Sequence, residues 1–142
     1  KFYNESAKLH TEGFEKAKLY YRLAVMNKKR GRVSQAYNYA NKTLAAQPSF
    51  GKAHLLIAGL YASSANNCGT TQFEKRATFW LAANVAEKAG RVDGSLKKAA
   101  AKTAANYRAK APSKQDIFTE GMAGKTVTIG CWINKTVTVP NL

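Results

Sequence analysis

The sequence predicts an all-α array of helix-turn-helix repeats, an α-α superhelix, that ends in a short β-hairpin. Residues 17–48 carry small residues at helical spacing within two apolar stretches, namely Ala24, Ala36 and Ala40. Gly31 separates the two stretches and Pro48 ends the second one. Small residues let antiparallel helices approach closely, and Gly and Pro end helices. A similar spacing starts again near Gly51, in keeping with a repeat of about 34 residues.

The first helices follow from apolar residues that stand three or four positions apart. Residues 2–10 predict a short helix, which we interpret as the end of an upstream repeat, and residues 11–13 predict a break. Residues 15–30 predict the first helix of the complete repeat. Ser34 is the expected N-cap of its partner helix over residues 35–46.

The second repeat begins near Gly51 but departs from the first. Residues 63–71 (SSANNCGTT) are small and polar, and they predict a loop inserted between its two helices. A helix over 73–89 follows, and we expect Gly90 to end it. The helical part closes with a helix over 94–110.

The C-terminal tail has a different period. Apolar residues alternate there with Thr and Gly, namely Val127, Ile129, Cys131, Ile133, Val137 and Val139. Alternation of β-branched residues predicts two strands, with the turn at Asn134 and Lys135. Because a lone hairpin is marginal in water, we expect it to dock on the last helices. The predicted organisation is a repeat array over 1–118 and a hairpin region over 119–142.

The repeat positions resemble those of the tetratricopeptide repeat (TPR) family. When Ala17 is counted as position one, Tyr20 takes the large fourth position, and Leu23 and Ala24 take the seventh and eighth. The stretches CGTTQFEKRATFWLAA and GRVDGSL and the GCWI hairpin are similar to the C-terminal half of a group of bacterial TPR proteins. The resemblance covers most of residues 17–140. It implies a protein that binds partners, and it transfers no catalytic residue.

The resemblance also implies a concave groove lined by the first helix of each repeat. Its expected lining residues are Tyr20, Asn27, His54 and Tyr61. The predicted function is a non-enzymatic scaffold that binds another protein or copies of itself. Two alternatives stay open: a structural subunit of an extracellular filament or other homopolymer, and a basic module that binds a polyanion such as nucleic acid or an acidic glycan.

The charge balance is the unusual feature of the composition. There are 23 Lys and Arg against 8 Asp and Glu, which gives a net charge of +15. Such a surface attracts polyanions and acidic partners. The candidate basic patch consists of Lys28, Lys29, Arg30, Arg32, Lys97, Lys98, Lys102 and Arg108. An ordinary solvated surface is the alternative interpretation.

The sequence contains no recognisable catalytic or metal-binding motif. His10 and His54 have no partner at metal-ligand spacing, and the acids are scattered among cations. The segment GMAGKT lacks the first Gly of a phosphate-binding loop, because Thr119 stands at that position. We therefore predict no enzyme, no metal and no cofactor.

The two cysteines, Cys68 and Cys131, are too few for a zinc site. They form either one disulfide or two buried thiols, and the sequence favours the disulfide, which an oxidising compartment permits. We expect a location in the cell envelope, periplasmic or extracellular, with the cytoplasm as the alternative. Candidate glycosylation sites of the Asn-X-Ser/Thr type are Asn4, Asn41 and Asn134, a mild excess over the roughly one triplet expected by chance at this composition. Chance is the favoured explanation, although Asn134 at the predicted hairpin turn would be accessible.

No apolar run approaches the roughly 18 residues that span a bilayer, and no signal peptide is recognised. The chain begins at Lys1 rather than at Met. We therefore expect a processed product or a fragment of a longer array.

Overall fold

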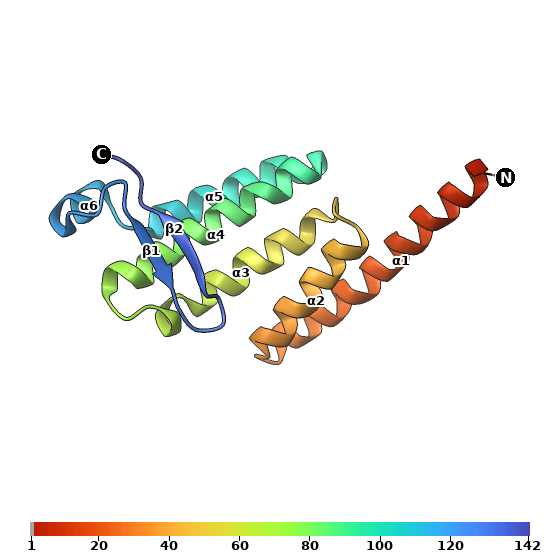
Figure 1. Ribbon diagram of the computed structural model, residues 1–142, viewed down its shortest axis with the longest axis horizontal. Coiled ribbons are helices and arrows are strands. Elements are labelled where there is room, and N and C mark those ends of the chain that lie inside the picture. Colours follow the sequence, from red (N-terminus) through yellow and green to blue (C-terminus); the bar gives the residue numbers. More distant parts are fainter. Residues whose placement is uncertain (1) are drawn as a thin grey trace.

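The computed structural model describes residues 2–142, and it describes side chains from residue 11 onward (Figure 1). The elements are α1 (Phe2–Lys29), α2 (Val33–Ala46), α3 (Gly51–Cys68), α4 (Gln72–Val92), the 3-10 helix η1 (Gly94–Leu96), α5 (Lys97–Lys110), α6 (Lys114–Glu120), β1 (Thr126–Ile129) and β2 (Lys135–Thr138). The predicted fold class, all-α with a C-terminal β-hairpin, is confirmed.

Neighbouring helices pack as pairs along the chain. The extensive contacts are those of α1 with α2, of α3 with α4 and of α4 with α5. The contact between α2 and α3 is much smaller, and that between α1 and α3 is smaller still (Figure 1). The α1–α2 pair is therefore joined to the rest of the molecule through a limited area, mostly against α3.

The turn between α1 and α2 forms at Gly31, as predicted. Gly31 has a φ of +74°, and its N–H donates to the carbonyl of Lys28 at 3.1 Å. The N–H of Arg32 donates to the carbonyl of Asn27 at 2.9 Å, which completes a Schellman motif. The chain re-enters a helix directly at residue 33, so the predicted N-cap is wrong. Ser34 lies inside α2, and the residue at the cap position, Arg32, makes no capping hydrogen bond with its side chain.

Two predicted breaks in the helices are also wrong, because glycine there serves close packing. α1 is continuous through residues 11–13, and a Cβ on Gly13 would lie 3.0 Å from the carbonyl oxygen of Ala46 in α2. α4 continues past Gly90 to Val92, and a Cβ on Gly90 would lie 3.2 Å from Lys97 Cα at the start of α5. A glycine inside a helix costs about 1 kcal/mol relative to Ala, which the packing of the neighbouring helix offsets.

The inserted loop predicted over residues 63–71 is wrong as well. α3 continues to Cys68, so only residues 69–71 connect it to α4. The hydroxyl of Ser63 donates to the carbonyl of Leu60 at 3.0 Å, which satisfies this polar side chain within the helix. α4 then begins with a capping box in which the Thr71 hydroxyl and the Glu74 carboxylate each accept a backbone N–H.

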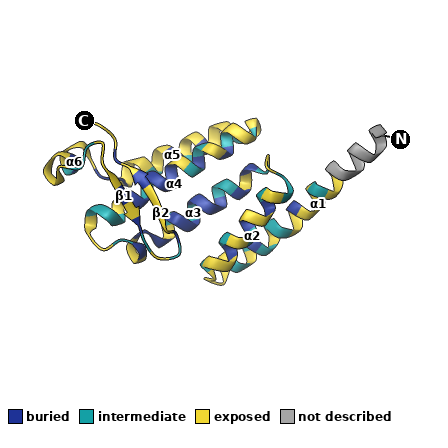
Figure 2. Cartoon of the chain, viewed as in Figure 1, coloured by how far each residue is buried: buried dark blue, intermediate teal, exposed yellow. Residues whose placement is uncertain are grey.

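The core is built around alanines and around α3. Among the described side chains of the α1–α2 pair, four alanines have no exposed surface, namely Ala17, Ala24, Ala36 and Ala40. Figure 2 shows that α3 is buried along most of its length, with α2 on one side and α4 on the other. Small side chains at these interfaces let the helix axes approach, and larger ones such as Leu60 and Tyr61 fill the space between pairs.

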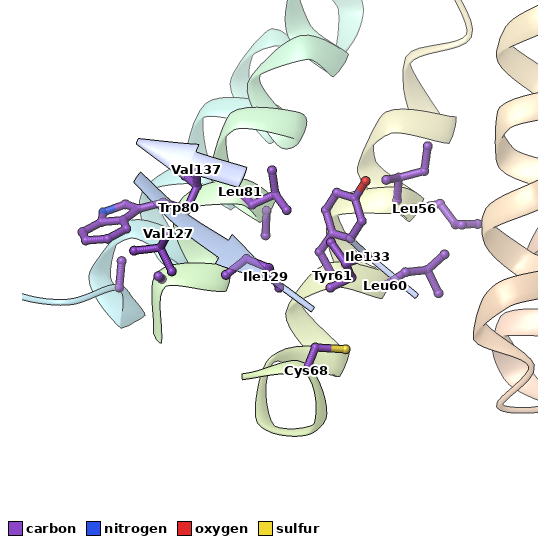
Figure 3. Packing of buried hydrophobic residues seen from close by; sticks show 14 of the residues in the cluster. Leu56, Leu60, Tyr61, Cys68, Trp80, Leu81, Val127, Ile129, Ile133 and Val137 are labelled. Carbon is purple, nitrogen blue, oxygen red and sulfur yellow. The ribbon is translucent and has the colours of Figure 1, made fainter. Parts of the chain in front are cut away.

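The C-terminal strands form the predicted antiparallel hairpin, with Thr126 opposite Thr138 and Ile129 opposite Lys135. The turn is longer than predicted, because Lys135 already belongs to β2 and residues 130–134 form the connection. Valines and isoleucines of the hairpin face the helices, and they share one apolar cluster with side chains of α3 and α4 (Figure 3). The threonines of both strands face outward.

The two cysteines lie at disulfide-bonding distance, with a Cα–Cα separation of 5.1 Å. Cys68 is the last residue of α3, and Cys131 lies in the hairpin turn with a φ of 54°. The pair therefore links the end of a buried helix to a turn that lies 63 positions further along the chain.

Replacement of Ala24 by Leu tests the close approach of α1 and α2. Since Ala24 has no exposed surface, the larger side chain has no space, and we expect the free energy of unfolding to fall by roughly 1–3 kcal/mol. Denaturant unfolding measures this, with Ala105→Leu on the exposed face of α5 as the control. An unchanged midpoint for Ala24→Leu would contradict the packing described above.

Loss of the disulfide is expected to destabilise the protein. In the chain-entropy model, a link across 63 positions contributes about 4 kcal/mol by restricting the unfolded chain. Unfolding of Cys68→Ser/Cys131→Ser is compared with that of the oxidised and reduced wild type. Mass spectrometry of the alkylated, non-reduced protein checks the bond itself, and two alkylated thiols in the natively isolated chain would refute it.

Candidate functional site

Two adjoining hollows lie between α1 and α3. The first, of 370 Å³, is lined by the middle of α1, the α2–α3 connection, the start of α3 and Asp93 after α4. The second, of 530 Å³, continues between the C-terminal half of α1 and the next turn of α3. Both hollows are lined by Tyr21 and Lys52, so they form one depression, which we call the inner groove.

The floor of the inner groove is aromatic and aliphatic. The rings of Tyr21 and Phe50 lie 5.2 Å apart between centroids, and that of Phe14 lies 6.2 Å from Phe50. Val25 and Leu55 extend this apolar surface along the two helices. Such a floor offers pockets for an apolar side chain of a partner.

The rim of the inner groove is strongly basic. Of the side chains that the structure describes, five basic ones line it, namely Lys18, Arg22, Lys28, Lys29 and Lys52. The acid among the lining residues is Asp93, whose Oδ1 already accepts the N–H of Ser95 at 3.0 Å and its hydroxyl at 2.7 Å. At the outer end, Lys18 Nζ lies 3.6 Å from Glu15 Oε1 and 4.7 Å from the centroid of Phe14.

Lys28 spans the groove from α1 to α3. A Cβ added to Gly59 of α3 would lie 2.8 Å from Lys28 Nζ and 4.0 Å from the hydroxyl of Tyr107 in α5. The ammonium group therefore lies over a helix position without a side chain. This places a cation over the middle of α3.

The four predicted lining residues do not come together in the inner groove. Tyr20 faces α2, where its ring stacks on Tyr39 at 6.4 Å. Asn27 donates its amide to the carbonyl of Leu23, one turn earlier, at 2.8 Å. Tyr61 is buried in the core with 1% of its surface exposed.

The residues of α1 that line the groove lie on a different face of the helix from the predicted one, because Tyr21 rather than Tyr20 faces the groove. Lys18, Tyr21, Val25 and Lys28 follow one another at spacings of three or four, so they share one face of the helix. One residue corresponds to about 100° around a helix, and Tyr20 therefore points elsewhere. The signal in the sequence that would have identified this face is its combination of lysines at both ends with an aromatic and an aliphatic residue between them.

The predicted basic patch is divided into two clusters, and all eight of its side chains are exposed. One cluster, residues 28–32, surrounds the α1–α2 turn and contributes Lys28 and Lys29 to the inner groove. The other lies on α5, on the opposite side of α3 (Figure 1). There Arg108 pairs with Glu87 at 2.7 Å, and this hydrogen bond lowers the pKa of the Glu87 carboxyl.

His54 is half-buried in α3, and it is not among the residues that line the inner groove. Burial lowers the pKa of His54, and the positive charges of Lys88 and Arg91 lower it further. The imidazole is therefore kept neutral near neutral pH, which fits a packing role.

No group of three or more His, Cys, Asp or Glu side chains suited to a metal ion occurs among the described residues. No helix of the described chain has the length and apolar character needed to cross a bilayer.

Of the candidate glycosylation sites, Asn134 is exposed in the hairpin turn and Asn41 is exposed on α2. Asn4 and His10 lie outside the part of the chain whose side chains are described.

In comparisons with known proteins, no family model, no curated protein and no solved structure matches this chain.

The lowered pKa of His54 predicts a dependence of stability on pH. On acidification the unfolded chain takes up a proton near the ordinary pKa of 6.5, before the folded chain does. Stability should therefore fall as pH drops from above 6.5 toward the lowered pKa of the folded state. Denaturant unfolding at several pH values on either side of 6.5 measures this slope.

The variant His54→Gln serves as the control, because it removes this titration and should flatten the curve in that window. The carboxyls of Glu87 and Asp116 have lowered pKa values, so their contribution is lost only in a more acidic range. A slope that His54→Gln leaves unchanged would contradict the assignment.

Proposed function

We propose that this chain is a non-enzymatic, TPR-like scaffold that binds an acidic segment of a partner protein in the inner groove. The observation that carries the proposal is the composition of that groove. Among the described residues, five cations surround an aromatic floor, while the lining includes one acid, Asp93, which accepts hydrogen bonds from Ser95. A segment with Asp or Glu on either side of an apolar anchor complements both features.

The two parts of the groove supply different terms of the binding free energy. Burial of an apolar anchor against Tyr21 and Phe50 supplies affinity, because about 25 cal/mol is gained per Å² of apolar surface removed from water. The exposed cations of the rim add less affinity, but they steer an acidic partner and set its orientation. Such binding should weaken as salt concentration rises.

The net charge favours a different, acidic chain over a second copy as the partner. Two molecules of net charge +15 repel each other, whereas an acidic chain is attracted. The oxidisable cysteine pair supports a location in the cell envelope or outside the cell, where disulfides persist.

A subunit of a homopolymer is the second candidate, and one observation favours it. Leu19 and Met26 lie seven residues apart on the face of α1 turned away from α2, with 56% and 43% of their surface exposed. Uncovered apolar surface at the end of a repeat array is a contact for another helix. Copies joined in this way would form a ring or a filament.

Charge reversal in the groove tests the proposed function. Peptides are selected from a display library of short random sequences on the intact, oxidised protein. We expect the selected peptides to place Asp and Glu beside an aromatic or aliphatic residue. Their Kd should rise about tenfold or more, equivalent to 1.4 kcal/mol, in Arg22→Glu/Lys52→Glu, because two attractive charges become repulsive.

The matched control is Lys97→Glu/Lys98→Glu on α5, which changes the net charge equally but lies outside the groove. An equal loss in both variants, or strong binding of nucleic acid by the wild type, would favour the polyanion alternative. Light scattering of the free protein at low and high salt adds a further outcome. A polymer that the wild type forms even at high salt, and that the variant Leu19→Lys/Met26→Lys does not form, would favour the homopolymer.

A further inference from the structure

The shape of the inner groove depends on the angle between two helix pairs. One wall of the groove is α1 and the other is α3, and these two helices contact each other only slightly. The α1–α2 pair is held mainly through the limited contact of α2 with α3. Any interaction that fixes the position of α2 against α3 therefore also fixes the shape of the inner groove.

An aromatic cluster from three elements lies at this joint. The indole ring of Trp132, in the hairpin turn, lies 5.1 Å from the ring of Tyr37 in α2 and 5.5 Å from that of Tyr61 in α3. The Tyr37 and Tyr61 rings lie 6.0 Å apart, and the Tyr61 hydroxyl donates to that of Tyr37 at 3.5 Å. We call these three residues the aromatic joint.

The aromatic joint lies on the side of α3 opposite to the groove. Tyr61 follows the groove residue Lys52 by nine positions, which is two and a half turns of a helix with 3.6 residues per turn. The indole N–H of Trp132 donates to the hydroxyl of Ser64 at 3.1 Å, on the same side of α3. Groove and joint therefore lie on opposite faces of one helix, and both contact the α1–α2 pair.

Covalent and apolar contacts hold the hairpin turn in place. Cys131, directly before Trp132, is paired with Cys68 at the end of α3. Ile133, directly after it, is buried in the main apolar cluster, and the strands on either side pack against α4. Trp132 is thus presented from a turn that belongs to the α3–α4 body, and it contacts α2 through Tyr37.

We propose that Trp132, held by the Cys68–Cys131 pair, is a positioning residue that fixes the angle of the α1–α2 pair against α3–α4 and so sets the shape of the inner groove. Reduction of the disulfide then loosens the turn and releases this angle. The groove thereby becomes sensitive to redox conditions, although neither cysteine lies in it. The consequence for ligand binding rests on the function proposed above, whereas the consequence for the angle does not.

A purely stabilising role for Trp132 makes a different prediction. Removal of the indole would then lower the free energy of unfolding, as any large core truncation does. The folded molecules that remain would keep the same angle and the same affinity. A measurement on the folded protein therefore separates positioning from stability.

The test measures the distance between the two bodies by electron-spin resonance. A genetically encoded spin-labelled amino acid is placed at Asn38 of α2 and at Lys98 of α5, both of which are exposed, so that the native cysteines stay paired. Distance distributions are recorded for the oxidised chain, the reduced chain, Trp132→Ala and Trp132→Phe. Ile117→Ala in α6, which removes a buried side chain away from the joint, is the control for lost stability.

We expect the distribution to broaden or shift in the reduced chain and in Trp132→Ala. It should remain as in the wild type in Ile117→Ala and be largely restored in Trp132→Phe, which keeps a ring at the joint. The Kd of the selected acidic peptide should rise about fivefold or more in the same two samples, within the usual range of coupling between sites.

Unchanged distributions in both the reduced chain and Trp132→Ala would overturn the proposal, whatever the groove binds. Altered distributions with an unchanged Kd would also overturn it, because the angle would then not set the shape of the groove. If the wild type selects no peptide, the proposed function fails, and the distance measurement still decides whether Trp132 fixes the angle.

Discussion

Burial of α3 is the constraint on which the rest of this structure depends. The helix packs along its length on α4, meets α2 on another side, and is covered near its C-terminal end by the hairpin turn. Each neighbour must approach closely, which explains why alanine is frequent on the facing surfaces and why Tyr61 and Leu60 fill the gaps between them. The face of α3 that remains open toward α1 is the one that forms the inner groove.

The arrangement of the helices decides which kind of anionic partner the positive charge favours. A net charge of +15 would by itself suit any anionic partner. Cations gathered around an apolar floor favour an acidic polypeptide with an apolar anchor, because a purely electrostatic ligand would leave Tyr21 and Phe50 unused. In the second cluster, on α5, Arg108 is already paired with Glu87.

Predictions made from short stretches of sequence were correct where the conformation depends mainly on neighbouring residues. The alternation around Val127 and Val137 predicts the hairpin, and Gly31 predicts the α1–α2 turn, because both depend on neighbouring backbone and side chains. The same reasoning failed at Gly13 and Gly90. There the glycine lies in a helix against a neighbouring helix, and its small size matters more than its freedom of rotation.

The sequence by itself determined the fold class, the order of most elements and the excess of positive charge, since these follow from composition and from periods of two and 3.6. Only the tertiary structure decided which face of α1 lines the groove, because one residue turns a helix face by about 100°. It also decided that residues 63–68 are helical, since Ser64 and Cys68 meet Trp132 and Cys131 from the far end of the chain. Contacts between residues more than 60 positions apart leave no local signal by which to predict them.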